Sequence, residues 1–215
     1  MASIRKRSQH AAIALVAAAT LAGCGGTGPQ PRQTGKFADS FAELLDLKLS
    51  DPDLNDFEHQ VYLRAKETER IAQADYDEAF AKYSTCMSER GKPVSLKKLK
   101  NGLYYENPAL LEPGESLDAA MDVVSSCQKG TIGSLAEMFA FQQGNPELLR
   151  DPDEAAFRCL EGSGLVPDGY SFGQFSKSMN EPKPGGGRLK DMPFDFKSDD
   201  VQACLVGAGI ALAIE

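Results

Sequence analysis

The sequence predicts a mostly α-helical protein, built as two disulfide-tied helical repeats with long irregular connections. Three observations lead to this prediction. Apolar residues recur at helical spacing along several segments, no stretch shows sustained strand alternation, and four cysteines fall into two similar sequence contexts. The hydrophobic fraction of 42% allows a buried core, and the length of 215 residues allows one domain or two small ones.

Helix signals place the expected helices. Ser50–Asp53 offers an N-cap, a proline in the first turn and acidic residues, so we expect a long helix from there to Gly91, broken near Asp75. A shorter helix is expected over Phe37–Lys48, and Asp151–Glu154 opens another.

The cysteine-bearing segments near the ends of both halves also read as helices. Ser116 and Ser198 are expected to cap the helices that carry Cys127 and Cys204. The run Leu205–Ile214 is almost continuously apolar and is expected as a buried closing helix. The alternative for this run is a tail that binds a partner or touches a membrane.

The same four cysteines mark an internal repeat, with one unit over residues 36–145 and a second over residues 146–215. Cys86-Met87-x-x-x-Gly91 in the first unit matches Cys159-Leu160-x-x-x-Gly164 in the second. A duplicated unit that closes its own bridge predicts the pairs Cys86–Cys127 and Cys159–Cys204. Crossed pairing between the units stays open at the level of sequence.

Residues 1–23 have the pattern of a secretory signal peptide. A basic segment at residues 5–7 precedes an apolar stretch at residues 11–21, which is too short to cross a hydrocarbon core of about 30 Å. The four residues Leu21-Ala22-Gly23-Cys24 that follow resemble the lipobox of bacterial lipoproteins. The alternatives are an ordinary secreted protein cut nearby and a short signal anchor.

The lipobox resemblance implies that Cys24 receives diacylglycerol, becomes the new N-terminus and anchors the protein to the extracytoplasmic face of the bacterial cell membrane. Residues 24–35 then form the lipidated cysteine and a Gly- and Pro-rich tether. Loss of residues 1–23 leaves 20 basic and 31 acidic residues, a formal charge of −11. Anionic headgroups repel such a body, so we expect the lipid alone to hold it at the membrane.

The second half carries a recurring arrangement of Cys, Gly and Pro-Asp over roughly residues 151–207. Its elements are Phe157-Arg158-Cys159-Leu160, Gly164, Pro167-Asp168, a Gly-rich loop, and Asp199-Asp200 leading to Ala203-Cys204. This arrangement resembles a module of exported actinobacterial proteins and lipoproteins. Residues 76–130 match it more loosely, with Lys92-Pro93-Val94 in place of Pro-Asp. The group has no assigned activity, so the resemblance implies topology and compartment only.

Four lysines form a short basic patch within this acidic chain. They are Lys92, Lys97, Lys98 and Lys100. The patch is a candidate contact for an anionic envelope polymer or for phosphate headgroups. The alternative is a solvated amphipathic turn in which Leu96 and Leu99 point inward. Because the whole chain has a net charge of −8, we expect no nucleic-acid partner.

No combination of residue types points to catalysis or to a metal. His59 is the single histidine after residue 23 and stands in a predicted helix without an evident nucleophile. Residues 51–55 begin like a calcium-binding EF-hand loop, but Asp56 replaces the required glycine and Tyr62 the closing glutamate. We therefore expect no cofactor and no metal.

The leading hypothesis is a lipid-anchored extracytoplasmic envelope protein that acts as a binding or accessory module, with an envelope protein or polymer as its partner, and that is not an enzyme. The alternative is an envelope hydrolase that uses carboxylates the sequence does not single out. A small-ligand carrier is a third hypothesis, although the mature chain is short for a two-lobed clamshell.

Overall fold

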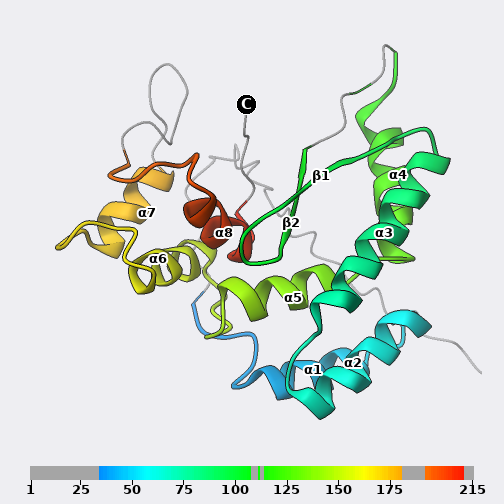
Figure 1. Ribbon diagram of the computed structural model, residues 1–215, viewed down its shortest axis with the longest axis horizontal. Coiled ribbons are helices and arrows are strands. Elements are labelled where there is room, and N and C mark those ends of the chain that lie inside the picture. Colours follow the sequence, from blue (N-terminus) through cyan, green and yellow to red (C-terminus); the bar gives the residue numbers. More distant parts are fainter. Residues whose placement is uncertain (1–33, 108–110, 112–113, 181–191, 211–215) are drawn as a thin grey trace, which may run out of the picture. The chain divides into compact units, whose positions relative to one another are not determined.

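The structure, a computed structural model, describes residues 34–107, 111, 114–180 and 192–210, and these form a mostly helical body (Figure 1). They belong to the unit Arg32–Glu215. The predicted signal peptide, the predicted lipidation site Cys24, most of the predicted tether and the end of the apolar tail lie outside the described residues. The helical fold class is confirmed, whereas the repeat arrangement and its boundaries stay predictions.

The described residues contain eight helices and one two-stranded sheet. The helices are α1 (Phe41–Leu49), α2 (Asp56–Thr68), α3 (Gln73–Glu89), α4 (Leu117–Lys129), α5 (Leu135–Gly144), α6 (Pro152–Gly162), α7 (Phe172–Asn180) and α8 (Asp199–Gly207). The strands β1 (Ser95–Lys98) and β2 (Tyr104–Asn107) pair antiparallel. No helix among the described residues is long and apolar enough to cross a membrane.

The long helix expected from Ser50–Asp53 is two helices. The first begins later than expected, at Asp56, because Asn55 is its N-cap and accepts a 2.9 Å hydrogen bond from the backbone nitrogen of Glu58. It ends at Thr68 and is followed by the C-cap residue Glu69, whose φ of 57° lies in the left-handed region. The second starts at Gln73, so the break lies a few residues before Asp75.

The hairpin is the main departure from the expected secondary structure. β1 covers part of the segment expected as an amphipathic turn, and its loop is closed by a 2.8 Å bond from Leu99 N to Leu103 O. Leu99 is buried as expected and Leu96 is half-buried. A strand of four residues is too short to show the alternation by which strands are recognised in a sequence.

Two disulfides fix the helices in pairs. Cys86 of α3 bonds Cys127 of α4, and Cys159 of α6 bonds Cys204 of α8. The pairing expected from the internal similarity is therefore confirmed, and the crossed alternative is wrong. The sequence separations of 41 and 45 residues make each bridge worth about 4 kcal/mol in the chain-entropy model.

A continuous hydrophobic core joins these pairs. Tyr76 of α3 stacks on Phe139 of α5 with ring centroids 4.1 Å apart, and it also stacks with Tyr104 of β2 at 5.7 Å. In the second half, Phe157 of α6 contacts Phe175 of α7 at 5.8 Å. The core therefore depends on aromatic contacts between segments far apart in the sequence.

The closing helix α8 crosses α5 at two glycines. A Cβ atom added to Gly144 would lie 2.4 Å from the Cα atom of Gly207, so neither position has room for a side chain. The helix begins at Asp199, earlier than the apolar run, and ends at Gly207, earlier than expected. Of the run expected as a buried closing helix, residues 205–207 are helical and Leu205 is buried, whereas residues 208–210 follow the helix and residues 211–214 lie outside the described residues.

Candidate binding site

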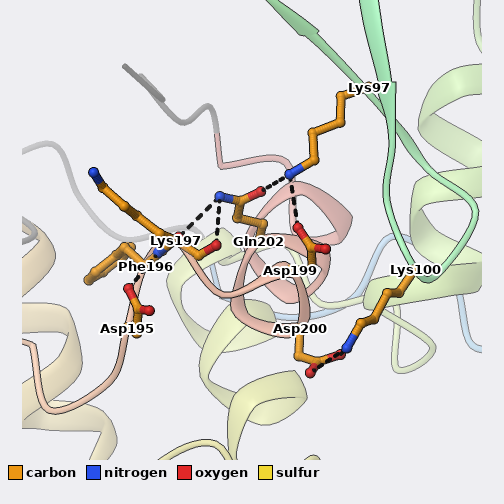
Figure 2. A network of polar contacts seen from close by, with 8 residues as sticks. All are labelled: Lys97, Lys100, Asp195, Phe196, Lys197, Asp199, Asp200 and Gln202. Atoms are coloured by element: carbon orange, nitrogen blue, oxygen red, sulfur yellow. Dashed lines mark hydrogen bonds and ion pairs between the residues drawn. The ribbon is translucent and has the colours of Figure 1, made fainter.

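Lysines of the hairpin extend to the first turn of α8. Lys97 Nζ lies 2.8 Å from Oδ1 of Asp199 and 3.2 Å from Oε1 of Gln202. Lys100 Nζ lies 2.9 and 3.0 Å from the two carboxylate oxygens of Asp200 (Figure 2). The two aspartates also stabilise the helix itself, because negative charge at a helix N-terminus complements the helix dipole.

The other two lysines of the predicted basic patch are paired as well. Lys98 Nζ lies 2.8 Å from both carboxylate oxygens of Asp77 on α3, and Lys92 pairs with Glu115. The hairpin thus lies between α3 and α8 and holds a carboxylate of each (Figure 1). All four lysines are balanced by acidic partners within the chain. Their proposed contact with an anionic ligand stays a prediction.

These pairs shift the protonation of the groups involved. The hydrogen bond from Lys97 lowers the pKa of Asp199. For Asp77, burial acts to raise the pKa, but the hydrogen bonds from Lys98 and Gln73 together outweigh burial, and the pKa is lowered. The hydrogen bond to Asp77 in turn raises the pKa of Lys98. These shifts favour the charged forms of Asp199, Asp77 and Lys98.

The tip of the hairpin is also held through amides. Asn101 Nδ2 donates a 3.0 Å hydrogen bond to the backbone oxygen of Ala203 in α8. From the other side, Gln73 Nε2 of α3 donates a 3.0 Å hydrogen bond to the backbone oxygen of Gly102. These contacts fix the hairpin loop, and with it Lys100, against α8.

Two adjacent cavities lie beside this contact, and we call them the paired cavities. The larger, of about 420 Å³, is lined by Lys100, Asn101 and Asp200 and by the disulfide Cys159–Cys204. The smaller, of about 230 Å³, is lined by Glu147, Leu149, Ala155 and Arg158, among others. Three residues line both cavities, and they are Gln143, Cys159 and Ser163.

Two of the shared residues have polar groups without a hydrogen bond to the described residues, and we call these groups uncommitted. Within the described part of the chain, neither the side-chain amide of Gln143 nor the hydroxyl of Ser163 makes a hydrogen bond. A primary amide offers two donors and two acceptor lone pairs, and a hydroxyl offers one donor and two acceptor lone pairs. The wall between α5 and α6 can therefore bind a polar ligand without breaking an internal contact.

His59 and the segment that begins like an EF-hand loop lie outside the residues that line the paired cavities. His59 lies half-buried on α2. Asp51 Oδ1 accepts a 2.9 Å hydrogen bond from Asp53 N in a turn, and Asn55 is used as the cap of α2. Over the described ranges, no group of three or more His, Cys, Asp or Glu side chains is arranged to hold a metal ion.

One buried carboxylate was not singled out from the sequence. Glu58 is only 3% exposed, and its Oε1 accepts hydrogen bonds from Leu135 N at 3.0 Å and Ser134 Oγ at 3.1 Å, while its Oε2 accepts one from Asn55 Nδ2 at 2.6 Å. It therefore caps the N-terminus of α5 from another helix. The spacing Asn55-x-x-Glu58, a capping-box pattern, is the signal that could have found it.

No family model, curated protein or solved structure matches this chain. The function is therefore proposed from the residues themselves.

Proposed function

We propose that this protein is a lipid-anchored extracytoplasmic protein of the bacterial envelope, which acts as a binding or accessory module. The observation that carries the binding role is the paired cavities, whose wall holds the uncommitted amide of Gln143 and hydroxyl of Ser163. The observation behind the location is the lipobox-like sequence ending at Cys24.

The disulfides support an extracytoplasmic location. Bonds such as Cys86–Cys127 and Cys159–Cys204 form and persist in oxidising compartments and are rare in the cytosol. Diacylglycerol on Cys24 would supply two acyl chains, which is the number that stable anchoring requires, since one chain binds membranes only marginally.

The geometry of the paired cavities supports binding. The larger volume, about 420 Å³, falls within the range of roughly 300–1,000 Å³ typical of ligand pockets. The walls come in large part from α5, α6 and α8, which are held together by the Cys159–Cys204 bridge and by the close crossing at Gly144 and Gly207. A pocket with walls fixed in this way loses little conformational entropy when a ligand enters.

Anchoring is tested by the N-terminal peptide of the protein extracted from membranes. We expect mass spectrometry to find a chain that begins at Cys24 and carries diacylglycerol through a thioether. The Cys24→Ala variant should remain unprocessed or leave the membrane. A processed Cys24→Ala product that stays in the membrane fraction would contradict the proposed anchor.

A further inference from the structure

We propose that the paired cavities bind a short peptide with a free carboxylate, with Arg158 pairing with the carboxylate and Gln143 with a main-chain amide. This inference rests on the proposed binding function and names its ligand class. It follows from the groups that line the cavities and from how much of their hydrogen-bonding capacity the chain itself uses.

Arg158 is the cation best placed to bind an anionic group. Its guanidinium lies 3.8 Å from Glu154, beyond hydrogen-bond length, and its side chain is 54% exposed. Lys100, the cation of the larger cavity, is already held by both oxygens of Asp200. The planar fork of an arginine matches a carboxylate in a bidentate arrangement, so Arg158 gives the smaller cavity, which Glu147 also lines, a group that can hold a carboxylate.

Gln143 extends the match from a carboxylate to a peptide. Its amide lies in the wall shared by both cavities and has no hydrogen bond to described residues. A primary amide donates and accepts at once, as a peptide group does, so the two can pair reciprocally. Ser163, in the same wall, offers a second polar contact to the main chain of the ligand.

Apolar surface beside these groups accommodates small side chains. The larger cavity is lined by Leu165, Ala203 and the Cys159–Cys204 bridge, and the smaller by Leu149 and Ala155. A short peptide offers a terminal carboxylate, main-chain amides and apolar side chains together. A simple carboxylate offers only the first of these, and it would leave the Gln143 amide and the apolar walls unused.

The test uses the full-length protein in detergent micelles and calorimetric titration with tri-alanine. We expect tri-alanine with a free C-terminus to bind, and its C-terminal amide to bind about tenfold more weakly, because a charged hydrogen-bonded pair is lost. Acetate, which carries the carboxylate alone, should not compete at an equal concentration. Equal binding of the acid and the amide, or full competition by acetate, would overturn the proposal.

Variants assign the binding to this wall. Arg158→Gln should weaken tri-alanine about tenfold and abolish the preference for the free carboxylate, and Gln143→Leu should weaken both probes. Arg90→Gln is the matched control, because Arg90 is an exposed arginine outside the residues that line the paired cavities. Each variant is checked for both disulfides and for an unchanged thermal midpoint. Wild-type binding by Arg158→Gln would overturn the assignment.

The outcomes separate this inference from the proposed function. Diacylglycerol on Cys24 without tri-alanine binding would remove the peptide proposal and leave the anchored module in place. If the protein extracted from membranes binds tri-alanine but its Cys24 carries no lipid, the anchor proposal fails and the peptide proposal stands.

Discussion

At the scale of single residues, the buried Glu58 and the half-buried Glu106 illustrate how the surroundings of a carboxylate decide its effect on stability. Glu58 accepts hydrogen bonds from Asn55, Ser134 and the backbone of Leu135. Among the described residues, Glu106 accepts hydrogen bonds from the Tyr83 hydroxyl, which lies 3.1 Å from each carboxylate oxygen. Burial raises the pKa of Glu106, and the Tyr83 bond only partly offsets it. Glu58 therefore stabilises the fold as a cap, whereas ionised Glu106 destabilises it.

Replacing Glu58 should be costly. Glu58→Ala removes the acceptor of the Leu135 backbone nitrogen and one hydrogen bond each from the Ser134 hydroxyl and the Asn55 amide, so we expect a loss of about 2–4 kcal/mol in the free energy of unfolding. Urea unfolding measures it, with Glu67→Ala, an exposed glutamate of the same helix, as the control. A loss no larger than that of the control would contradict the capping role.

Glu106 should make stability depend on pH. Because its pKa is raised in the folded state above the ordinary 4.5, its favourable contribution is fully present below that value and is lost as pH rises through the folded pKa. Glu106→Gln should therefore be more stable than the wild type at pH 7. We expect a difference of about 0.5 kcal/mol, because the group is only partly buried, and no such gain at about pH 4. A difference independent of pH, measured by urea unfolding at both values, would refute this account.

At the scale of elements, the structure that local sequence signals determine is predictable, whereas the structure that depends on contacts between distant residues is not. Asp151 caps α6 and Ser116 caps α4 as expected, because both signals lie within a few residues of the helix they start. α5 was not expected, and its N-terminus is capped by Glu58 from 77 residues away. The hairpin is not predictable from the sequence either, because its strands have only four residues each and its lysines are held by carboxylates about a hundred residues later.

The candidate site follows the same division. The cysteine pairing was predictable, because the two halves repeat a short local pattern around Cys86 and Cys159. The paired cavities were not predictable from the sequence. Only the tertiary structure brings together the residues of their walls, among them Lys100, Gln143, Arg158 and Ala203. The predicted lysine patch was recognised as a group of charges, whereas its acidic partners were not visible from the sequence.

The crossing of α5 and α8 gives a prediction at this scale. A methyl group at Gly144 would meet the backbone of Gly207, so Gly144→Ala should force the helices apart and cost about 3 kcal/mol. Gly162→Ala is the control, because nothing lies within 4 Å of its added Cβ. Thermal unfolding compares the two. Equal midpoints for both variants would show that the close crossing is absent.

At the scale of the whole molecule, the two bridges and the hairpin connect distant parts of the chain. Each bridge closes a loop of 41 or 45 residues within one half of the sequence. The hairpin then connects α3, through Lys98 and Asp77, to α8, through Lys97 and Asp199. Exposed pairs of this kind contribute little individually, about 0–1 kcal/mol, so most of the stability comes from the core and the bridges.

Cysteine variants test this view of the bridges. Cys86→Ser alone, Cys127→Ser alone and the double variant should each lose a similar amount, about 4 kcal/mol, because all three lack the same bond. Cys86→Ser combined with Cys159→Ser should lose about the sum of the two single variants. Additive losses for Cys86 and Cys127, in denaturant unfolding, would mean that these two are not partners.

The central claim, an anchored module that binds through the paired cavities, is tested most directly by crosslinking in intact envelopes. A photoreactive amino acid at Ser163 should yield a discrete adduct. The same group at Ser125, exposed on α4 and away from the cavity walls, should not. The Ser163 adduct should disappear when Cys24 is replaced by Ala. Identical adducts from both positions, or none from Ser163, would contradict the account.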